Sequence, residues 1–129
     1  MSGNEILVLV SDNDTKALYE AVLQGSQYDL TTHSYDDELP EMPMQVYSMV
    51  ILHFEPSMLR EINELVRRIS QCRINQASPT VLVVISKSWL GHVPQELTTL
   101  ADEIIAFPFT PKALLETVNK YVLRGNSFG

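Results

Sequence analysis

The sequence predicts a single α/β domain in which a parallel five-stranded sheet carries helices on both faces. Three observations lead to this prediction. Short apolar runs alternate with segments of helical periodicity along the 129 residues. Several of these runs are continuously apolar, as in strands that are buried on both faces. Right-handed crossover connections turn such an alternation into a parallel sheet. A chain of this length buries about two thirds of its unfolded surface, so one domain needs no disulfide.

Composition and charge argue against several classes of function. The formal charge is -7, and the nine Lys and Arg residues include one adjacent pair, Arg67-Arg68, so the basic patch of a nucleic-acid-binding protein is missing. No apolar run approaches the roughly 18 residues of a membrane span. The N-terminus lacks the basic stretch of a secretory signal, and the single Cys72 suits a reducing compartment. We therefore expect a cytoplasmic, soluble domain without direct contact to nucleic acid or membrane.

The first third of the chain reads as strand, helix and strand. Ile6 to Val10 is continuously apolar and runs into the polar turn Ser11 to Asp14. Asp14 or Thr15 is expected to cap a helix that continues to about Gln24. Its apolar stripe should contain Ala17, Leu18, Ala21 and Val22. Tyr28 to Ser34 alternates loosely and predicts the second strand.

The central strand organises the whole domain. Ser48 to Leu52 has a β-branched centre, and His53, Glu55 and Pro56 are expected to stop it. A buried parallel strand would deliver His53 to the carboxyl edge of the sheet, where open α/β folds place their ligand sites. The preceding segment, Tyr35 to Tyr47, contains Pro40 and Pro43. Each interior proline costs a helix about 3 kcal/mol, so this crossover should be irregular.

The rest of the chain continues the alternation. An amphipathic helix is predicted from about Ser57 to Cys72, followed by a central strand from Thr80 to Ser86 and a loop from Lys87 to Val93. Pro94 should open a short helix to about Ala101, and Glu103 to Phe107 should form the fifth strand. Thr110 should cap the last helix, with Pro111 first and a stripe of Leu114, Leu115, Val118 and Val122. These elements place the domain at residues 1–124 and a tail at 125–129.

Over essentially its whole length the chain resembles the receiver domains of two-component response regulators. The resemblance rests on the apolar first strand with its acidic end, on Val50 to Pro56 in the position of the phospho-acceptor strand, and on Ala101 to Lys112. The last stretch is similar to the family's fifth strand, its Lys-Pro-Phe turn and the start of its last helix. The resemblance implies a flavodoxin-like sheet of order 2-1-3-4-5 and a cis peptide between Phe107 and Pro108.

The phosphorylation site of the family is altered in this chain. In the family an aspartate accepts the phosphoryl group, an acidic pair holds Mg²⁺, a Ser or Thr bonds the phosphoryl oxygens and a lysine pairs with them. By the resemblance, His53 stands at the acceptor position and Phe107 at the lysine position. The hydroxyl falls on Ser86, or on Val84 in another register. The acidic pair falls on Ser11 and Asp12, or after a one-residue slip on Asp12 and Asn13, with Asp14 nearby.

These changes remove what phosphoryl transfer depends on, namely positioning and charge stabilisation by metal and cation. The resemblance therefore implies a pseudo-receiver, a receiver fold without a working aspartyl-phosphate switch, and we expect no catalysis, no metal and no cofactor. His53 should fill the former pocket and hydrogen-bond to Asp12 or Ser86. Its alternatives are a phosphorylated nucleophile, a metal ligand shared with Asp12 and Asp14, and a pH-sensing group. Phe107 should pack near His53 or form an aromatic wall for a ligand.

The function expected from this combination is a phosphorylation-independent protein-interaction module in two-component-type signalling. Its partner would be a signalling protein or a fused output domain, with a homodimer as a further assembly. The resemblance places the surface on the predicted short helix, fifth strand and last helix, at Trp89, Leu90, Ile104 and Lys112. Ile104 stands where the family has a switch aromatic. The rival hypotheses are a sensor that binds a small ligand or metal in the remodelled pocket, and a receiver phosphorylated at Asp12, Asp14 or His53.

Overall fold

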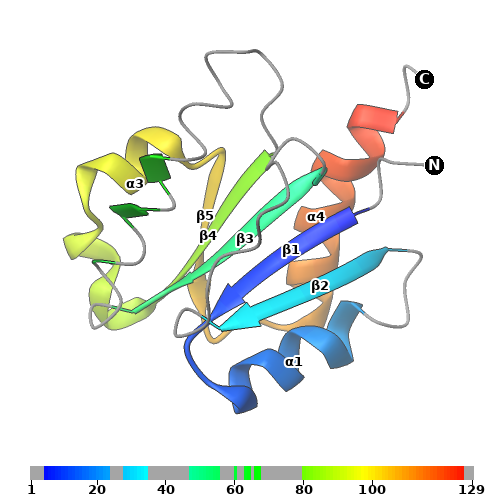
Figure 1. Cartoon of the computed structure of the whole chain (residues 1–129), viewed down its shortest axis with the longest axis horizontal. Helices are drawn as coiled ribbons and strands as arrows, with labels where there is room; N and C mark the ends of the chain where they lie inside the picture. The colour runs from blue at the N-terminus through cyan, green and yellow to red at the C-terminus, as the bar shows by residue number, and fades with distance from the viewer. Residues whose placement is uncertain are drawn as a thin grey trace.

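The structure, a computed structural model, describes residues 5–23, 28–34, 47–55, 60, 63–64, 66–67 and 80–126, with the backbone alone for 122–126. Its centre is a five-stranded sheet of order β2-β1-β3-β4-β5 in which every neighbouring pair is parallel (Figure 1). The strands are β1 (Glu5–Val10), β2 (Asp29–Ser34), β3 (Met49–Phe54), β4 (Thr80–Ser86) and β5 (Glu103–Phe107). The predicted fold class and strand order are thus confirmed.

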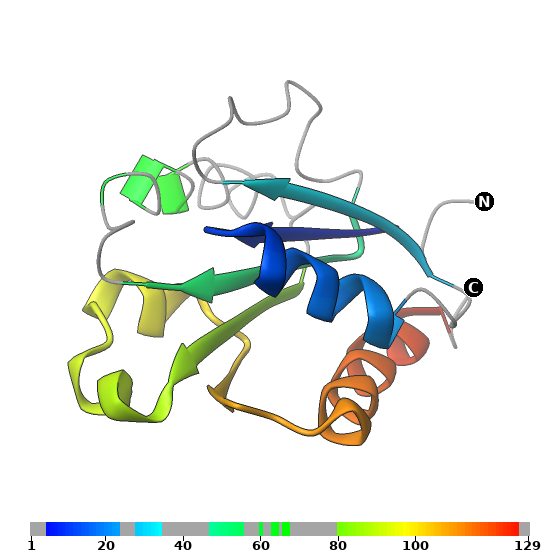
Figure 2. The same ribbon diagram turned by 90° about the horizontal axis from the view of Figure 1, so that it is seen from below.

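Helices cover both faces of the sheet. α1 (Asn13–Leu23) and α4 (Pro111–Asn126) pack on one face and α3 (Gln95–Leu100) on the other, and the 3-10 helix η3 (Lys87–His92) directly follows β4. Figure 2 shows α1 and α4 close together, with η3 and α3 on the other side of the molecule. The segment from Lys87 to Val93, which was predicted to be a loop, is therefore mostly helical.

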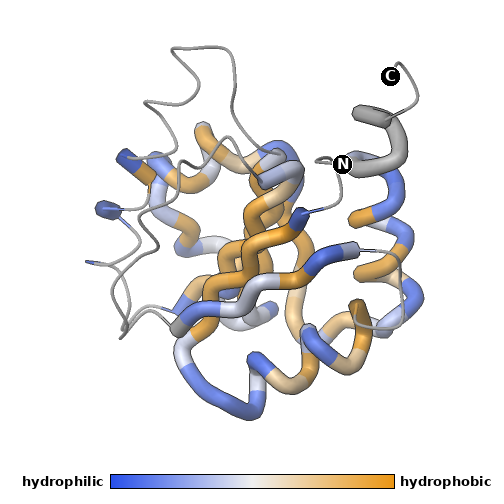
Figure 3. The backbone as a smooth tube through the Cα atoms, turned by 45° about the vertical axis from the view of Figure 1, so that its right-hand side comes forward, coloured by the Kyte–Doolittle hydropathy of each residue, from blue (hydrophilic) through white to orange (hydrophobic). Residues whose placement is uncertain are grey.

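Two hydrophobic clusters, one on each face, explain why the central strands are apolar without interruption. Alternate residues of β1, β3 and β4 point to opposite faces, and most of them have no exposed surface. One cluster joins these strands to Leu97 and Leu100 of α3, and the other joins them to α1 and α4. Figure 3 shows the resulting hydrophobic centre of the sheet. Each fully buried aliphatic side chain contributes about 1.5–3 kcal/mol.

The start of α1 differs from the prediction. Asp12, and neither Asp14 nor Thr15, caps the helix: its Oδ1 accepts a hydrogen bond of 2.7 Å from the Thr15 amide. The predicted apolar stripe is right only in part: Val22 packs against the core cluster and Leu18 is half-buried, but Ala17 and Ala21 are exposed. The residues buried against the sheet are Tyr19 and Leu23. They lie four apart on one face, and their larger side chains remove more apolar surface from water than alanines can.

The last helix agrees with the prediction in its cap, its first residue and three of its four stripe residues, whereas the side chain of the fourth, Val122, lies outside the described residues. Thr110 Oγ1 accepts a hydrogen bond of 3.1 Å from the Ala113 amide, and Pro111 is the first helical residue. Leu114 and Val118 are buried and Leu115 is partly buried in the same cluster. The peptide bond between Phe107 and Pro108 is cis, as the resemblance implies.

Two predicted segments fall largely outside the described residues. They are the irregular crossover from Tyr35 to Tyr47, of which Tyr47 alone is described, and the helix from about Ser57 to Cys72. Within the second segment the described residues Arg60, Asn63, Glu64, Val66 and Arg67 are helical. In the described part of the chain, no helix combines the length and the apolar character that a bilayer crossing requires.

Candidate functional site

His53 is built into β3 and does not follow its end. The predicted strand ended at Leu52, but β3 continues to Phe54, because His53 and Phe54 pair with Val84 and Ile85 of β4. The His53 side chain is only 5% exposed. A polar side chain in such a position needs a hydrogen-bond partner, since an unpaired buried polar group costs about 1–3 kcal/mol.

The partner of His53 is Tyr19 from α1. The Tyr19 hydroxyl oxygen lies 2.8 Å from His53 Nδ1 in the protein interior. The expected bond to Asp12 or Ser86 is therefore wrong. Both of those residues bond locally, with Asp12 capping α1 and Ser86 Oγ lying 3.0 Å from Ser88 Oγ. Tyr19 reaches His53 because the buried face of α1 packs directly on the sheet.

Aromatic rings surround this pair. The His53 ring meets Phe107 edge-on, with ring centroids 5.0 Å apart and an interplanar angle of 80°. Phe109 contacts Tyr19 at 5.7 Å and Phe107 at 5.5 Å between centroids. These distances are typical of favourable aromatic pairs, each of which adds about 0.5–1.5 kcal/mol beyond its buried area. Phe107 thus packs directly against the histidine.

Burial governs the charge of His53. Desolvation lowers the pKa of His53 below its ordinary value of 6.5, and the carboxylates of Glu55 and Asp12 oppose this shift in part. The imidazole is consequently neutral at physiological pH. The pKa of Asp12 is lowered, chiefly by the hydrogen bond from the Thr15 amide.

The polar turn after β1 is joined to the end of β3. Ser11 Oγ donates a hydrogen bond of 2.6 Å to Glu55 Oε2. Asp12 and Asp14 are exposed. Ser11 is thus engaged by a carboxylate that the sequence reasoning treated only as a strand terminator. The signal available was its position, two residues after His53 at the carboxyl end of a central strand.

A hollow of about 440 Å³ lies beside these groups at the carboxyl edge of the sheet. The carboxyl ends of the strands, the start of α1 and η3 lie along this edge (Figure 1). The hollow is lined by Thr15, His53, Phe54, Glu55, Ser86, Trp89 and Phe107. His53, Ser86 and Phe107, which the sequence predicts to share one site, all line this hollow. The sequence did not reveal Thr15, Phe54 or Glu55 as lining residues of the hollow, nor Tyr19 as the hydrogen-bond partner of His53.

The two residues that the sequence left open for the hydroxyl position lie in different surroundings. Val84 is fully buried in the core, whereas Ser86 pairs with Phe107 at the ends of β4 and β5 and faces the hollow. Ser86 is therefore the residue that presents a hydroxyl at this edge.

The residues predicted for an interaction surface occupy different environments. Trp89 and Leu90 in η3 are exposed large hydrophobic residues, at 42% and 44%. Ile104 packs against the cluster on the α3 side and offers less free surface. Lys112 is exposed and lies 4.0 Å from Glu116, a surface pair that contributes little to stability. Among the residues that the structure describes, no group of three His, Cys, Asp or Glu side chains is arranged to hold a metal ion.

Comparisons with known proteins identify the fold. No protein-family model and no curated protein matches the chain. Solved structures do match. A CheY-like receiver domain from Methanospirillum hungatei JF-1 is 18% identical, with a TM-score of 0.69 over 98% of both chains. The signal receiver domain of a protein named as a Luxo repressor from Vibrio parahaemolyticus is 14% identical, with a TM-score of 0.72 over 95% of this chain and 92% of that one.

A third structure places the same fold inside a longer protein. NtrX from Brucella abortus, solved in complex with ADP, is 14% identical with a TM-score of 0.70. The match covers 95% of this chain and 26% of NtrX. The chain therefore has the fold of a response-regulator receiver domain.

Proposed function

We propose that the chain is a pseudo-receiver, which acts as a phosphorylation-independent protein-interaction module in two-component-type signal transduction. The observation that carries this proposal is the buried hydrogen bond between His53 and Tyr19, at the position where the resemblance puts the phospho-acceptor. A neutral imidazole held in the core offers no carboxylate to a phosphoryl group or to Mg²⁺.

The surroundings of His53 support the same conclusion. Phosphoryl transfer needs a cation beside the transferred group. At the lysine position Phe107 instead packs its ring against His53. Of the acidic turn, Ser11 is bonded to Glu55 and Asp12 caps α1. The groups at the acceptor, lysine and acidic positions of the resemblance therefore have internal contacts in place of a phosphoryl group and its metal.

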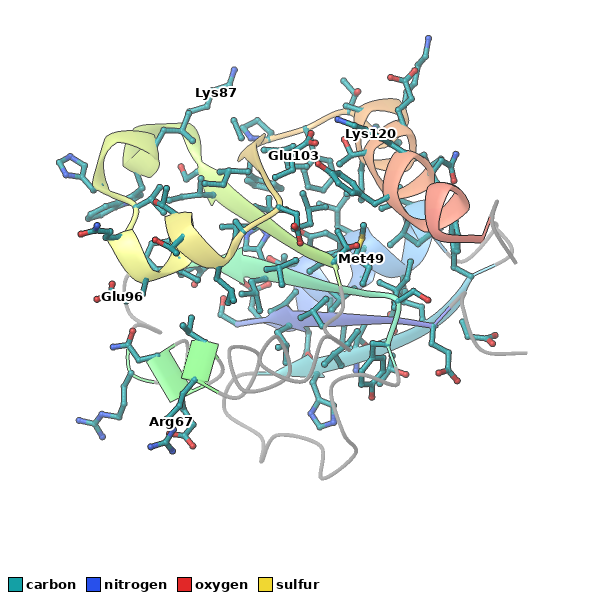
Figure 4. The ribbon with its side chains drawn as sticks, turned by 90° about the horizontal axis from the view of Figure 1, so that it is seen from above. Met49, Arg67, Lys87, Glu96, Glu103 and Lys120 are labelled. Carbon is teal, nitrogen blue, oxygen red and sulfur yellow. The ribbon has the colours of Figure 1, made fainter. Side chains whose placement is uncertain are left out.

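The partner is proposed to be a signalling protein or an output domain that reads one fixed receiver-like shape. Trp89 and Leu90 give η3 an exposed apolar patch, and aromatic residues are enriched in the cores of interfaces. A small polar cluster on β5 and α4 is ordered by internal hydrogen bonds. Glu103 accepts hydrogen bonds from Lys120 at 3.2 Å and Tyr121 at 2.8 Å (Figure 4). Such a polar cluster suits the rim of an interface, and the exposed apolar residues of η3 support an apolar centre there.

The test is incubation of the full chain with acetyl phosphate and Mg²⁺, followed by intact-protein mass measurement beside a phosphorylatable receiver as positive control. We expect no phosphoryl adduct on this chain. An adduct that forms on the wild type and is lost in Asp12→Asn, Asp14→Asn or His53→Gln would contradict the proposal and would identify the substitute acceptor.

A further inference from the structure

The hollow at the carboxyl edge combines a carboxylate with aromatic walls. Glu55 supplies the negative charge, and Trp89 and Phe107 supply aromatic surface. Among the described residues that line it, none is basic. Lys87 directly follows the lining residue Ser86 in the chain, but its side chain is exposed and points away from the body of the protein (Figure 4). Within the described lining, no basic residue therefore neutralises the charge of Glu55.

Glu55 has hydrogen-bonding capacity to spare. Its Oε2 accepts from Ser11, while its Oε1 accepts no hydrogen bond from any described residue. A carboxylate has about four acceptor sites. His53 also lines the hollow, and with Nδ1 bonded to Tyr19 its remaining ring nitrogen is available. Because burial lowers the pKa of His53, the imidazole places no positive charge there.

We propose that this hollow receives the guanidinium group of an arginine side chain from a partner protein, with Glu55 as its carboxylate partner and Trp89 and Phe107 as its aromatic walls. The inference deepens the proposed function and rests on it, because it says what kind of residue the interaction module recognises. The volume of about 440 Å³ falls within the range of small-ligand sites, roughly 300–1,000 Å³.

Arginine fits this arrangement better than lysine does. Its planar guanidinium can donate two parallel hydrogen bonds to one carboxylate and stack on an aromatic ring at the same time. It is also more weakly hydrated than an ammonium group, so its transfer into a partly enclosed site costs less. Cation–π contacts with tryptophan are the strongest of their kind.

Two features favour a protein side chain over a free small cation. Trp89 belongs both to the wall of the hollow and to the exposed surface, and Leu90 beside it is also exposed, so apolar residues flanking the arginine have a surface to cover. The chain carries a formal charge of -7, which steers a basic partner segment toward it. Tryptophan and arginine are also the residues in which binding energy concentrates at interfaces.

The test is an amide NMR titration of the full chain with three probes: an acetylated, amidated Leu-Arg-Leu peptide, its citrulline counterpart and N-acetyl-arginine amide. Citrulline keeps the shape of arginine and removes its charge. We expect the arginine peptide to shift the amides of Glu55 and Ser86 and the Trp89 indole signal. The citrulline peptide should bind at least about tenfold more weakly, because it loses the charge-assisted bonds.

Variants then locate the site. Glu55→Gln, which retains an oxygen to accept from Ser11, should weaken the arginine peptide about tenfold, and Trp89→Ala should weaken it by roughly threefold. Glu116→Gln is the matched control, because it neutralises an exposed carboxylate on α4 outside the hollow, and its affinity should equal that of the wild type.

Three results would overturn the inference. The first is equal affinity for the arginine and citrulline peptides, and the second is an affinity for the arginine peptide that Glu55→Gln does not change. The third is binding of N-acetyl-arginine amide as tight as that of the arginine peptide, which would indicate a site for a free small cation. The proposed function is tested separately, by whether a phosphoryl adduct forms with acetyl phosphate and Mg²⁺. A chain that stays unphosphorylated and does not bind the arginine peptide overturns this inference alone.

Discussion

The Tyr19 hydroxyl and His53 Nδ1 are 2.8 Å apart inside the protein, and this bond ties α1 to the strand that the resemblance associates with phosphorylation. It gives Nδ1 of the buried imidazole a hydrogen-bond partner, and the same ring meets Phe107 edge-on. At the position that the resemblance gives to the phospho-acceptor, the His53 side chain is thus engaged in packing and in a buried hydrogen bond.

Removal of the Tyr19 hydroxyl should destabilise the protein. Tyr19→Phe keeps the ring contacts but leaves His53 Nδ1 without this partner, at a cost of about 1–3 kcal/mol in the free energy of unfolding. Urea denaturation measures the change. Tyr121→Phe is the matched control, because that hydroxyl bonds Glu103 in a part-buried setting, and it should cost less. An equal loss in both variants would show that the buried bond has no special weight.

Stability should fall as the solution becomes acidic. The folded-state pKa of His53 is lowered by burial, with Glu55 and Asp12 opposing in part. Between that lowered pKa and the ordinary value of 6.5 the unfolded chain binds more protons than the folded one. The stabilising contribution is complete above about pH 6.5 and is lost progressively below it.

Melting temperatures of the wild type, His53→Gln and His92→Gln at pH 7.5 and 5.5 test this dependence. His53→Gln should reduce the pH dependence, whereas the exposed His92 should matter little. If His53→Gln leaves the pH dependence of the melting temperature unchanged, that dependence comes from other groups.

The cap of α1 should rest on Asp12 alone. Asp12→Ala should cost about 1 kcal/mol, because the Thr15 amide loses its acceptor. Asp12→Asn, which can still accept this bond, should restore most of the loss. Asp14→Ala removes only a charge in the first turn, for which a smaller effect of about 0.3–1 kcal/mol is expected. Thermal unfolding ranks the three variants, and a larger loss for Asp14→Ala would contradict the observed cap.

Restoring the acceptor alone should not restore the chemistry. His53→Asp would bury a carboxylate beside Phe107 with no cation, and should destabilise the fold by about 3 kcal/mol. Adding Phe107→Lys should recover part of this stability and allow binding of beryllofluoride with Mg²⁺, followed by fluorine NMR. If the single variant already binds beryllofluoride as well as the double variant, Phe107 does not block the site.

The fold was predictable because burial on both faces leaves a strong pattern in the sequence. Runs such as Ile6 to Val10 and Thr80 to Ser86 have few alternatives to a central parallel strand. The site was harder to predict, since its contacts depend on how a helix is rotated against the sheet. Tyr19 gave no signal of its own, and its pairing with His53 follows from the packing of α1. The role of Glu55 required the turn after β1 to be placed in space.

The most direct test of the account compares amide NMR spectra of the full chain with and without Mg²⁺ plus beryllofluoride, an aspartyl-phosphate mimic. If the pocket is committed to the bond between Tyr19 and His53, the signals of Asp12, His53 and Ser86 will not move. Localised shifts at these residues that extend to Trp89 and Ile104 would contradict the account and show that the site still switches on binding a phosphoryl group.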